Sequence, residues 1–217
     1  MLKKAFTLAE VLLVITVIGI VSALTIPNLA NKSSDEQTVI KLKNVKNDLD
    51  LAMQQAVLKY GPYKTWFPDD LSSDDETEAK ERIMEFLEHT DSNATFPFAA
   101  FNTDANYTKY TLNDGTIFAL KFGSNGICSG NSCNYMQAIV ATGGASGKTL
   151  GKQIFGFTLN PYDGIVKPYG QGSDIGTNNA FSVSNNINAT NWALHIGNLD
   201  YLKCASSLNW QSKTSCN

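Results

Sequence analysis

Residues 3–31 read KKAFTLAEVLLVITVIGIVSALTIPNLAN, and this stretch decides how the rest of the chain can be arranged. From Val11 to Asn31 it contains no Lys, Arg, Asp or Glu. An apolar run of this length can cross a bilayer as a helix. Glu10 stands at its entrance, and a charge buried in lipid costs at least a few kcal/mol. We therefore expect Glu10 to have a specific partner.

The block from Ala5 to Glu10, with two lysines before it and an apolar helix after it, resembles the class III leader of type IV pilins and type II secretion pseudopilins. The resemblance is specific over roughly the first tenth of the chain and continues more loosely through Pro27. It implies that a prepilin peptidase cuts between Ala5 and Phe6 and methylates the new amino terminus. It also implies that Glu10 of one subunit neutralises the Phe6 amino group of its neighbour. One departure is Ala5, because the family prefers Gly before the cut.

An ordinary secretory signal peptide is the alternative interpretation of the same residues. Lys3 and Lys4, the apolar core and the small residues Val21-Ser22-Ala23 fit such a peptide, which would be cut after Ala23. Glu10 argues against it, because it interrupts a segment that a signal peptide would keep apolar. The helical pattern also continues far beyond Ala23. We therefore favour the pilin-like interpretation.

The length and charge of the chain limit its class. Its 217 residues accommodate one ordinary domain plus an extended element. The net charge is -3, and removal of residues 1–5 with Lys3 and Lys4 would make it -5. A mildly acidic chain of this kind is a poor match for nonspecific nucleic-acid binding.

Four cysteines, Cys128, Cys133, Cys204 and Cys216, lie in the half of the chain expected outside the membrane. Their even number suits an oxidising compartment. Four cysteines allow three connectivities, of which Cys128 with Cys133 and Cys204 with Cys216 is the most economical. Zinc binding is the alternative, but thiolate ligands usually come as close Cys-x-x-Cys pairs, which this chain lacks. We expect disulfides.

An amphipathic helix follows the apolar run and ends at Gly61-Pro62. Its apolar positions recur at spacings of three and four and predict one buried face: Leu42, Val45, Leu49, Ala52 and Ala56. A continuous helix from Phe6 to Tyr60 would be about 80 Å long, so we expect its apolar half to project from the domain. Gly19 and Pro27 weaken that half, and the resemblance implies that it could extend there in a filament.

The rest of the chain predicts an α+β head domain. Ser73 begins a capping-box pattern and a helix through about Glu88. A hairpin is predicted from Tyr107 to Phe122 around the turn 113–115, because Asp-Gly between alternating strands favours a tight turn. Further strands are expected at 135–141, 155–159 and 164–167, in an antiparallel sheet that covers the helix stripe. From Tyr169 onward we expect irregular structure with one short helix, bounded by a disulfide.

Enzyme and cofactor signatures are weak in this sequence. Residues 143–149 resemble a phosphate-binding loop, but Thr142 stands where the first Gly is required and a strand follows in place of a helix. The acidic residues 74–76 lack the spacing of a calcium loop. We place His89 on the acidic helix and His195 in an apolar segment, with no catalytic pattern around either. We expect no enzyme activity, cofactor or metal.

These observations predict four regions and one function. The regions are a leader (1–5), a transmembrane and filament-core half of the helix (6–31), its amphipathic half (32–61) and the head domain (62–217). The predicted function is a structural pilin or pseudopilin subunit, held by one span in the bacterial cytoplasmic membrane with its head outside, then assembled into an extracellular or periplasmic filament. Its expected partners are prepilin peptidase, other subunits and the assembly platform with its ATPase. The alternatives are a tip pilin that captures a ligand or DNA, and an ordinary secreted or anchored domain.

Overall fold

The computed structural model describes residues 7–66, 73–91, 108–122, 136–144, 149, 151–159, 165–168 and 188–216. The chain divides into two compact units, Met1–Gln37 and Thr38–Asn217. The helix α1, Leu8–Tyr60, provides the regular structure of the first unit and begins the second. The predicted long N-terminal helix is therefore confirmed.

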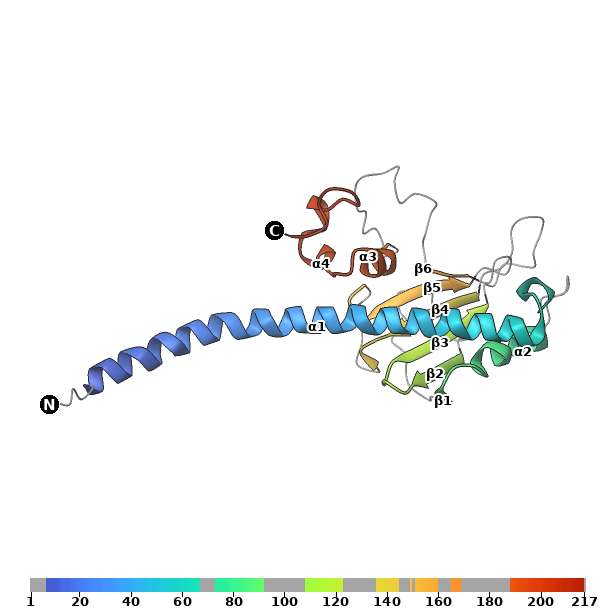
Figure 1. Cartoon of the computed structure of the whole chain (residues 1–217), viewed down its shortest axis with the longest axis horizontal. Coiled ribbons are helices and arrows are strands. Elements are labelled where there is room, and N and C mark those ends of the chain that lie inside the picture. The colour runs from blue at the N-terminus through green and yellow to red at the C-terminus, as the bar shows by residue number, and fades with distance from the viewer. Residues whose placement is uncertain are drawn as a thin grey trace. The chain divides into compact units, whose positions relative to one another are not determined.

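The second unit begins with residues 38–60 of α1, which cross the sheet (Figure 1). The predicted apolar stripe is confirmed, since all five of its side chains are at most 2% exposed: Leu42, Val45, Leu49, Ala52 and Ala56. The helix ends where the sequence predicts. Gly61 adopts a φ of 87°, which favours glycine, and its N–H donates to Val57 O at 2.9 Å. Pro62 follows, and a short 3₁₀ helix η1 spans Tyr63–Trp66.

An antiparallel sheet of six strands is the main element of the described part of the second unit. Its strands pair in chain order, so each strand lies beside its sequence neighbours. The strands are β1 (His89–Asp91), β2 (Thr108–Leu112), β3 (Ile117–Phe122), β4 (Met136–Ala141), β5 (Ile154–Leu159) and β6 (Val166–Pro168). The α+β fold and its antiparallel sheet are confirmed.

The β2–β3 hairpin turns as the sequence predicts. Gly115 has a φ of 79°, and its N–H donates to Leu112 O at 2.9 Å. The carboxylate of Asp114 accepts hydrogen bonds from the N–H and the hydroxyl of Thr116, each at 2.9 Å. This Asx-type turn fixes the start of β3.

One continuous core joins α1 to the sheet. Alternate residues of three central strands face the helix stripe and are at most 1% exposed: Phe118, Leu120, Ala138, Val140, Phe155 and Phe157. Because side chains alternate along a strand, these six share one face of the sheet. Burial of a large apolar side chain contributes about 1.5–3 kcal/mol, so this layer holds the unit together.

The second helix is shorter than the sequence predicts. α2 spans Ser73–Met84, and the turn after it leads into β1, so the expectation of a helix through Glu88 and of a helical His89 was wrong. Pairing with β2 explains the difference, because His89 is opposite Leu112 in the ladder. The His89 ring also stacks edge-on against Tyr110 at 4.8 Å between centroids. The side chains of the capping-box pattern at 73–76 lie outside the described residues.

The C-terminal region contains more helix than the single short one expected. α3 spans Ala189–His195, α4 spans Tyr201–Cys204, and a 3₁₀ helix η4 spans Ala205–Ser207. Trp192 is fully buried in the common core. The hydroxyl of Thr190 accepts a hydrogen bond from Gly156 N at 3.1 Å, and this bond fastens α3 to β5.

Candidate functional site

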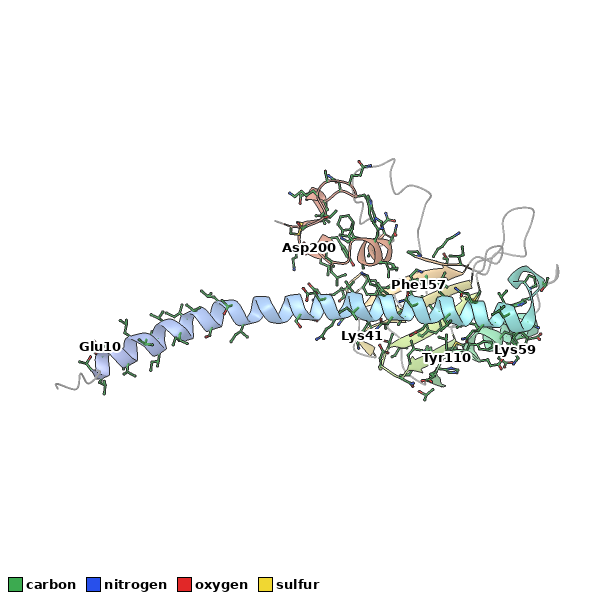
Figure 2. All side chains as sticks on the ribbon, viewed as in Figure 1. Glu10, Lys41, Lys59, Tyr110, Phe157 and Asp200 are labelled. Carbon is green, nitrogen blue, oxygen red and sulfur yellow. A yellow bond between two sulfur atoms is a disulfide. The ribbon has the colours of Figure 1, made fainter. Side chains whose placement is uncertain are left out.

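Glu10 has a partner within its own helix. Its carboxylate Oε2 accepts hydrogen bonds from Thr7 N at 2.8 Å and Thr7 Oγ1 at 2.9 Å, and Glu10 N donates to Thr7 Oγ1 at 3.3 Å. This reciprocal arrangement is a capping box that closes the first turn of α1, where Figure 2 shows Glu10. No hydrogen bond from a described residue reaches the other carboxylate oxygen, Oε1, which is therefore open to a second donor.

The segment Leu8–Ile26 of α1 is long and apolar enough to cross a membrane. Its Leu, Ile and Val side chains are between 51% and 82% exposed. The hydroxyls of Thr16 and Thr25 donate to the carbonyls of Leu12 and Val21, at 2.7 and 2.9 Å. These polar groups are therefore satisfied within the helix, as a lipid environment requires. A segment of this kind near the N-terminus is typical of a membrane anchor or a signal sequence.

The two positions proposed to weaken this segment lie inside an unbroken helix. α1 continues through Gly19 and Pro27 without interruption. A Cβ atom added at Gly19 would meet no atom within 4 Å other than the local backbone and chain neighbours, so no described contact demands glycine there. Whether the segment extends in a filament stays a prediction. Ala5 and Phe6, the proposed cleavage site, lie outside the described residues.

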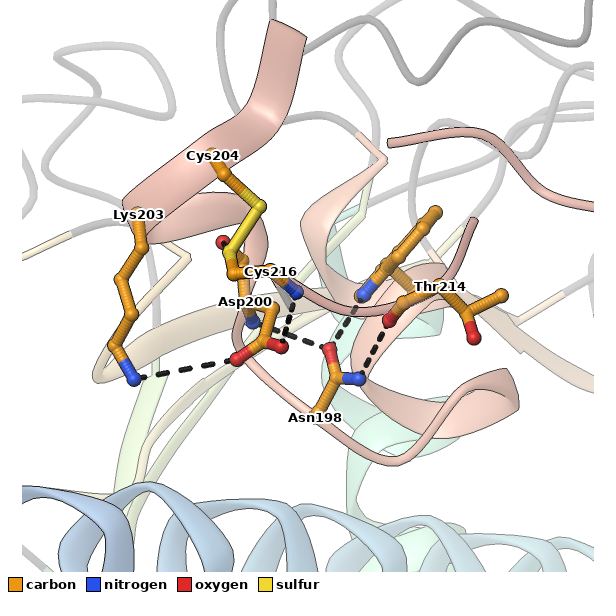
Figure 3. Close-up of polar contacts among 7 residues, drawn as sticks. Asn198, Asp200, Lys203, Cys204, Thr214 and Cys216 are labelled. Carbon is orange, nitrogen blue, oxygen red and sulfur yellow. Dashed lines mark hydrogen bonds and ion pairs between the residues drawn. A yellow bond between two sulfur atoms is a disulfide. The ribbon is translucent and has the colours of Figure 1, made fainter. Parts of the chain in front are cut away.

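The predicted pairing of Cys204 with Cys216 is confirmed. The two residues form a disulfide across a sequence separation of 12 (Figure 3). The carboxylate of Asp200 accepts a hydrogen bond from Cys216 N at 2.9 Å, which holds the end of the loop against α4. Cys128 and Cys133 lie outside the described residues, so their pairing stays a prediction.

Asn198 connects the disulfide loop to the buried helix α3. Its side-chain oxygen accepts from Trp192 Nε1 at 2.9 Å and from Asp200 N at 3.1 Å. Its amide nitrogen donates to Thr214 O at 2.8 Å (Figure 3). One amide therefore bonds to the core, to α4 and to the loop, so we expect the C-terminal region to behave as a single rigid piece.

A cluster of charged and aromatic side chains fixes α2 against the end of α1. Glu85 accepts hydrogen bonds from Lys59 Nζ and the Tyr60 hydroxyl. The Lys59 bond, followed by the Tyr60 bond, lowers the pKa of Glu85. The guanidinium of Arg82 lies 5.2 Å from the Tyr60 ring centroid and 5.6 Å from that of Trp66. This packing is structural, because it joins two helices.

A groove of about 440 Å³ lies between α1 and the β2–β3 turn. Carboxylates from three separate segments line it, namely Asp48, Glu88 and Asp114, above apolar side chains that include Val45, Leu87 and Leu112. Asn113 Nδ2 donates to Glu88 Oε2 at 2.6 Å. Desolvation and the nearby Asp114 carboxylate raise the pKa of Asp48. Among the described residues that line the groove there is no Lys or Arg, so its charge is uncompensated from within.

Sequence reasoning missed three parts of this arrangement. The Thr7-x-x-Glu10 pattern before an apolar run is itself a capping-box signature and could have been found. The Asn198 hydrogen bonds carry no local signal, because their partners are up to 16 residues away. The groove joins three segments that only the fold brings together.

Comparison with known proteins places the chain in a family. A family of unknown function (DUF6090) matches residues 10–143, which is more than half of the sequence, so the chain belongs to that family. No curated protein matches it. No solved structure matches it either.

Proposed function

We propose that this protein is a pilin-like structural subunit, stored in the cytoplasmic membrane through α1 and assembled into a filament by helix packing. The observation that carries the proposal is the Thr7–Glu10 cap at the start of the exposed apolar segment Leu8–Ile26. The cap alone would stabilise the start of any helix, including that of a plain anchor. A subunit that must recognise a cationic amino terminus also requires the carboxylate charge, which is costly at the lipid boundary unless it is paired.

The cap is compatible with the intermolecular role proposed for Glu10. Its hydrogen bonds with Thr7 use only Oε2, so Oε1 can accept a hydrogen bond from the amino group of a neighbour's Phe6. Cleavage between Ala5 and Phe6 would leave both Thr7 and Glu10 in the mature chain. The cap would then hold the carboxylate in one rotamer, which lowers the entropy cost of pairing with the neighbour.

The proposal includes a location and a set of partners. The head domain lies outside the membrane, where an oxidising compartment preserves the Cys204–Cys216 disulfide. Prepilin peptidase processes the chain, and an assembly platform with its ATPase supplies the energy for polymerisation. The protein itself performs no catalysis and requires no cofactor or metal.

Mass spectrometry of the N-terminus of protein purified from its native host tests the processing step. Methylated Phe6 as the first residue is the expected result. A chain that begins at Leu24 would show ordinary secretion, and one that retains Met1 would show a plain anchor. Either result would overturn the proposed function.

Two matched variants separate the charge of Glu10 from its capping role. Glu10→Gln keeps a side chain that can cap the helix but removes the charge. Thr7→Val removes the two cap hydrogen bonds of the Thr7 hydroxyl at a cost of about 1 kcal/mol but keeps the charge and the bond from the backbone N–H of residue 7. We expect Glu10→Gln to abolish filaments while the protein remains in the membrane, and Thr7→Val to assemble. Normal filaments from Glu10→Gln would contradict the pairing with Phe6.

A further inference from the structure

We propose that the acidic groove between α1 and the β2–β3 turn is the docking site for α4 of a second copy of this chain, with Lys203 entering between the groove carboxylates. This inference rests on the proposed function, because it supplies a contact between the head domains of assembled subunits.

The groove has the composition of a binding site for a lysine side chain, which carries a cation at the end of an apolar methylene chain. Three carboxylates of α1, of the segment after α2 and of the β2–β3 turn converge on one cavity. Two of them are held in place, Asp114 by Thr116 and Glu88 by Asn113. The apolar lining below them suits the methylene chain of a lysine, whose ammonium group would lie among the carboxylates.

No Lys or Arg among the described lining residues balances the charge of the Asp48 carboxylate in the groove. This carboxylate makes no hydrogen bond with another described residue, and its pKa is raised by desolvation and by the Asp114 carboxylate. A bound ammonium group would relieve this repulsion, because an opposite charge within about 4–6 Å favours the ionised carboxylate.

α4 offers the complementary surface. Leu202 is 39% exposed and the Lys203 side chain 55% exposed, so an apolar and a cationic side chain stand next to each other. Lys203 Nζ lies 4.0 Å from an oxygen of Asp200, the outer limit of an ion pair. The disulfide at Cys204 fixes the helix end that presents both side chains. This surface can therefore dock without first becoming ordered.

The two surfaces lie at opposite edges of the same compact unit. The groove includes residues next to β1 and β2 at one edge of the sheet, whereas α3 is fastened to β5 near the other edge. Figure 1 shows α3 and α4 on one side of α1, and β1 and β2 on the other. Contacts between two different patches are heterologous, and they produce rings or open helical filaments, not closed pairs.

Site-directed photocrosslinking tests the contact in the full-length chain in native membranes. Benzoylphenylalanine in place of Leu51, which lines the groove and is 54% exposed, is expected to yield a crosslinked homodimer. Mass spectrometry should place the crosslink within residues 199–213. The same probe in place of Leu58, 86% exposed on the same helix but not part of the groove lining, is the control and should yield no dimer. Absence of a dimer from the Leu51 position, or a crosslink to another segment, would overturn the proposal.

Charge reversal supplies the second measurement. Asp48→Lys and Lys203→Glu should each lower the yield of the crosslinked dimer by about fivefold, which is the upper end for a rim charge pair. The double variant should recover most of it. Glu81→Lys, an exposed reversal on α2 that is not part of the groove lining, should have no effect. A double variant no better than the single ones would reject the Asp48–Lys203 pairing.

The crosslinking result also separates the two proposals. A homodimer through the groove in a chain that retains Met1 would support the docking site while the proposed function fails. Methylated Phe6 and normal filaments, without the crosslink or any effect of charge reversal, would leave the proposed function intact and overturn the docking site.

Discussion

The indole nitrogen of Trp192 donates a hydrogen bond to the side-chain oxygen of Asn198 at 2.9 Å. This bond connects the fully buried tryptophan of α3 to the residue that organises the C-terminal loop. Asn198→Leu removes this acceptor, which also takes a hydrogen bond from Asp200 N, and the amide that donates to Thr214 O. Loss of these partly buried hydrogen bonds costs about 1–3 kcal/mol. We expect a fall of that size in the free energy of unfolding, measured by urea denaturation of the detergent-solubilised chain. Gln211→Ala, an exposed change in the same loop, should have almost no effect.

The Cys204–Cys216 disulfide should stabilise the second unit chiefly by restricting its unfolded chain. A closed loop of this size contributes roughly 3 kcal/mol in the chain-entropy estimate. The double variant Cys204→Ser, Cys216→Ser should therefore melt at a lower temperature and be cut by proteases within 205–215. Scanning calorimetry and limited proteolysis check this, and unchanged values for both would contradict it.

Two leucines of α1 provide a matched test of the buried stripe. Leu49 is 1% exposed, whereas Leu51 on the same helix is 54% exposed. Leu49→Ala should destabilise the protein by about 2–5 kcal/mol, because it removes buried methyl groups and leaves a cavity. Leu51→Ala should change the free energy of unfolding by less than about 0.5 kcal/mol. Equal effects of the two substitutions would show that α1 does not pack on the sheet through this stripe.

The hydrogen bonds to Glu85 predict an acid-sensitive component of stability. Because the pKa of Glu85 is lowered from 4.5 in the folded protein, its stabilising contribution is complete above that value and is lost as the pH falls through the lowered pKa. The difference in unfolding free energy between wild type and Glu85→Gln should therefore shrink from pH 7 to pH 3. A difference that stays constant with pH would show that the carboxylate charge has no part in it.

Asp48 should show the opposite dependence on pH. Its pKa is raised by desolvation and by Asp114, so the folded state holds its proton more tightly than the unfolded state does. The stabilising contribution of the protonated Asp48 carboxyl is present when the pH is below 3.8, the pKa of the unfolded chain. It is lost as the pH rises through the raised pKa of the folded protein. Asp48→Asn should then increase stability near pH 7 and lose this advantage below pH 3. NMR titration of the Asp48 carboxyl carbon measures the direction of the shift directly.

The parts of the fold that sequence predicts are those with a repeated or strongly local signal. The buried stripe of α1 repeats often enough to define its face, and Asp114-Gly115 defines the hairpin because both residues act within the turn itself. The end of α1 is equally local, since Gly61 alone supplies the required conformation.

The remaining parts depend on partners that are far apart in the sequence. β1 contains three residues, too few to show a period, and it exists because β2 supplies its hydrogen bonds. α2 stops before it for the same reason. The groove could not be predicted, because its three carboxylates belong to segments that meet only after folding. The sequence predicts a partner for Glu10 in a neighbouring chain, whereas the nearest partner in the structure is Thr7 of the same helix.

The strand order of the sheet has a consequence for how the protein folds. Every described strand after β1 pairs with the strand before it in the chain, so each new strand can pair with an edge that already exists. Loops between such neighbours have a small closure entropy, and a topology of this kind folds faster than one that joins distant segments. The pairing order also follows the order of synthesis, so the strands can pair one after another while later residues are still being made.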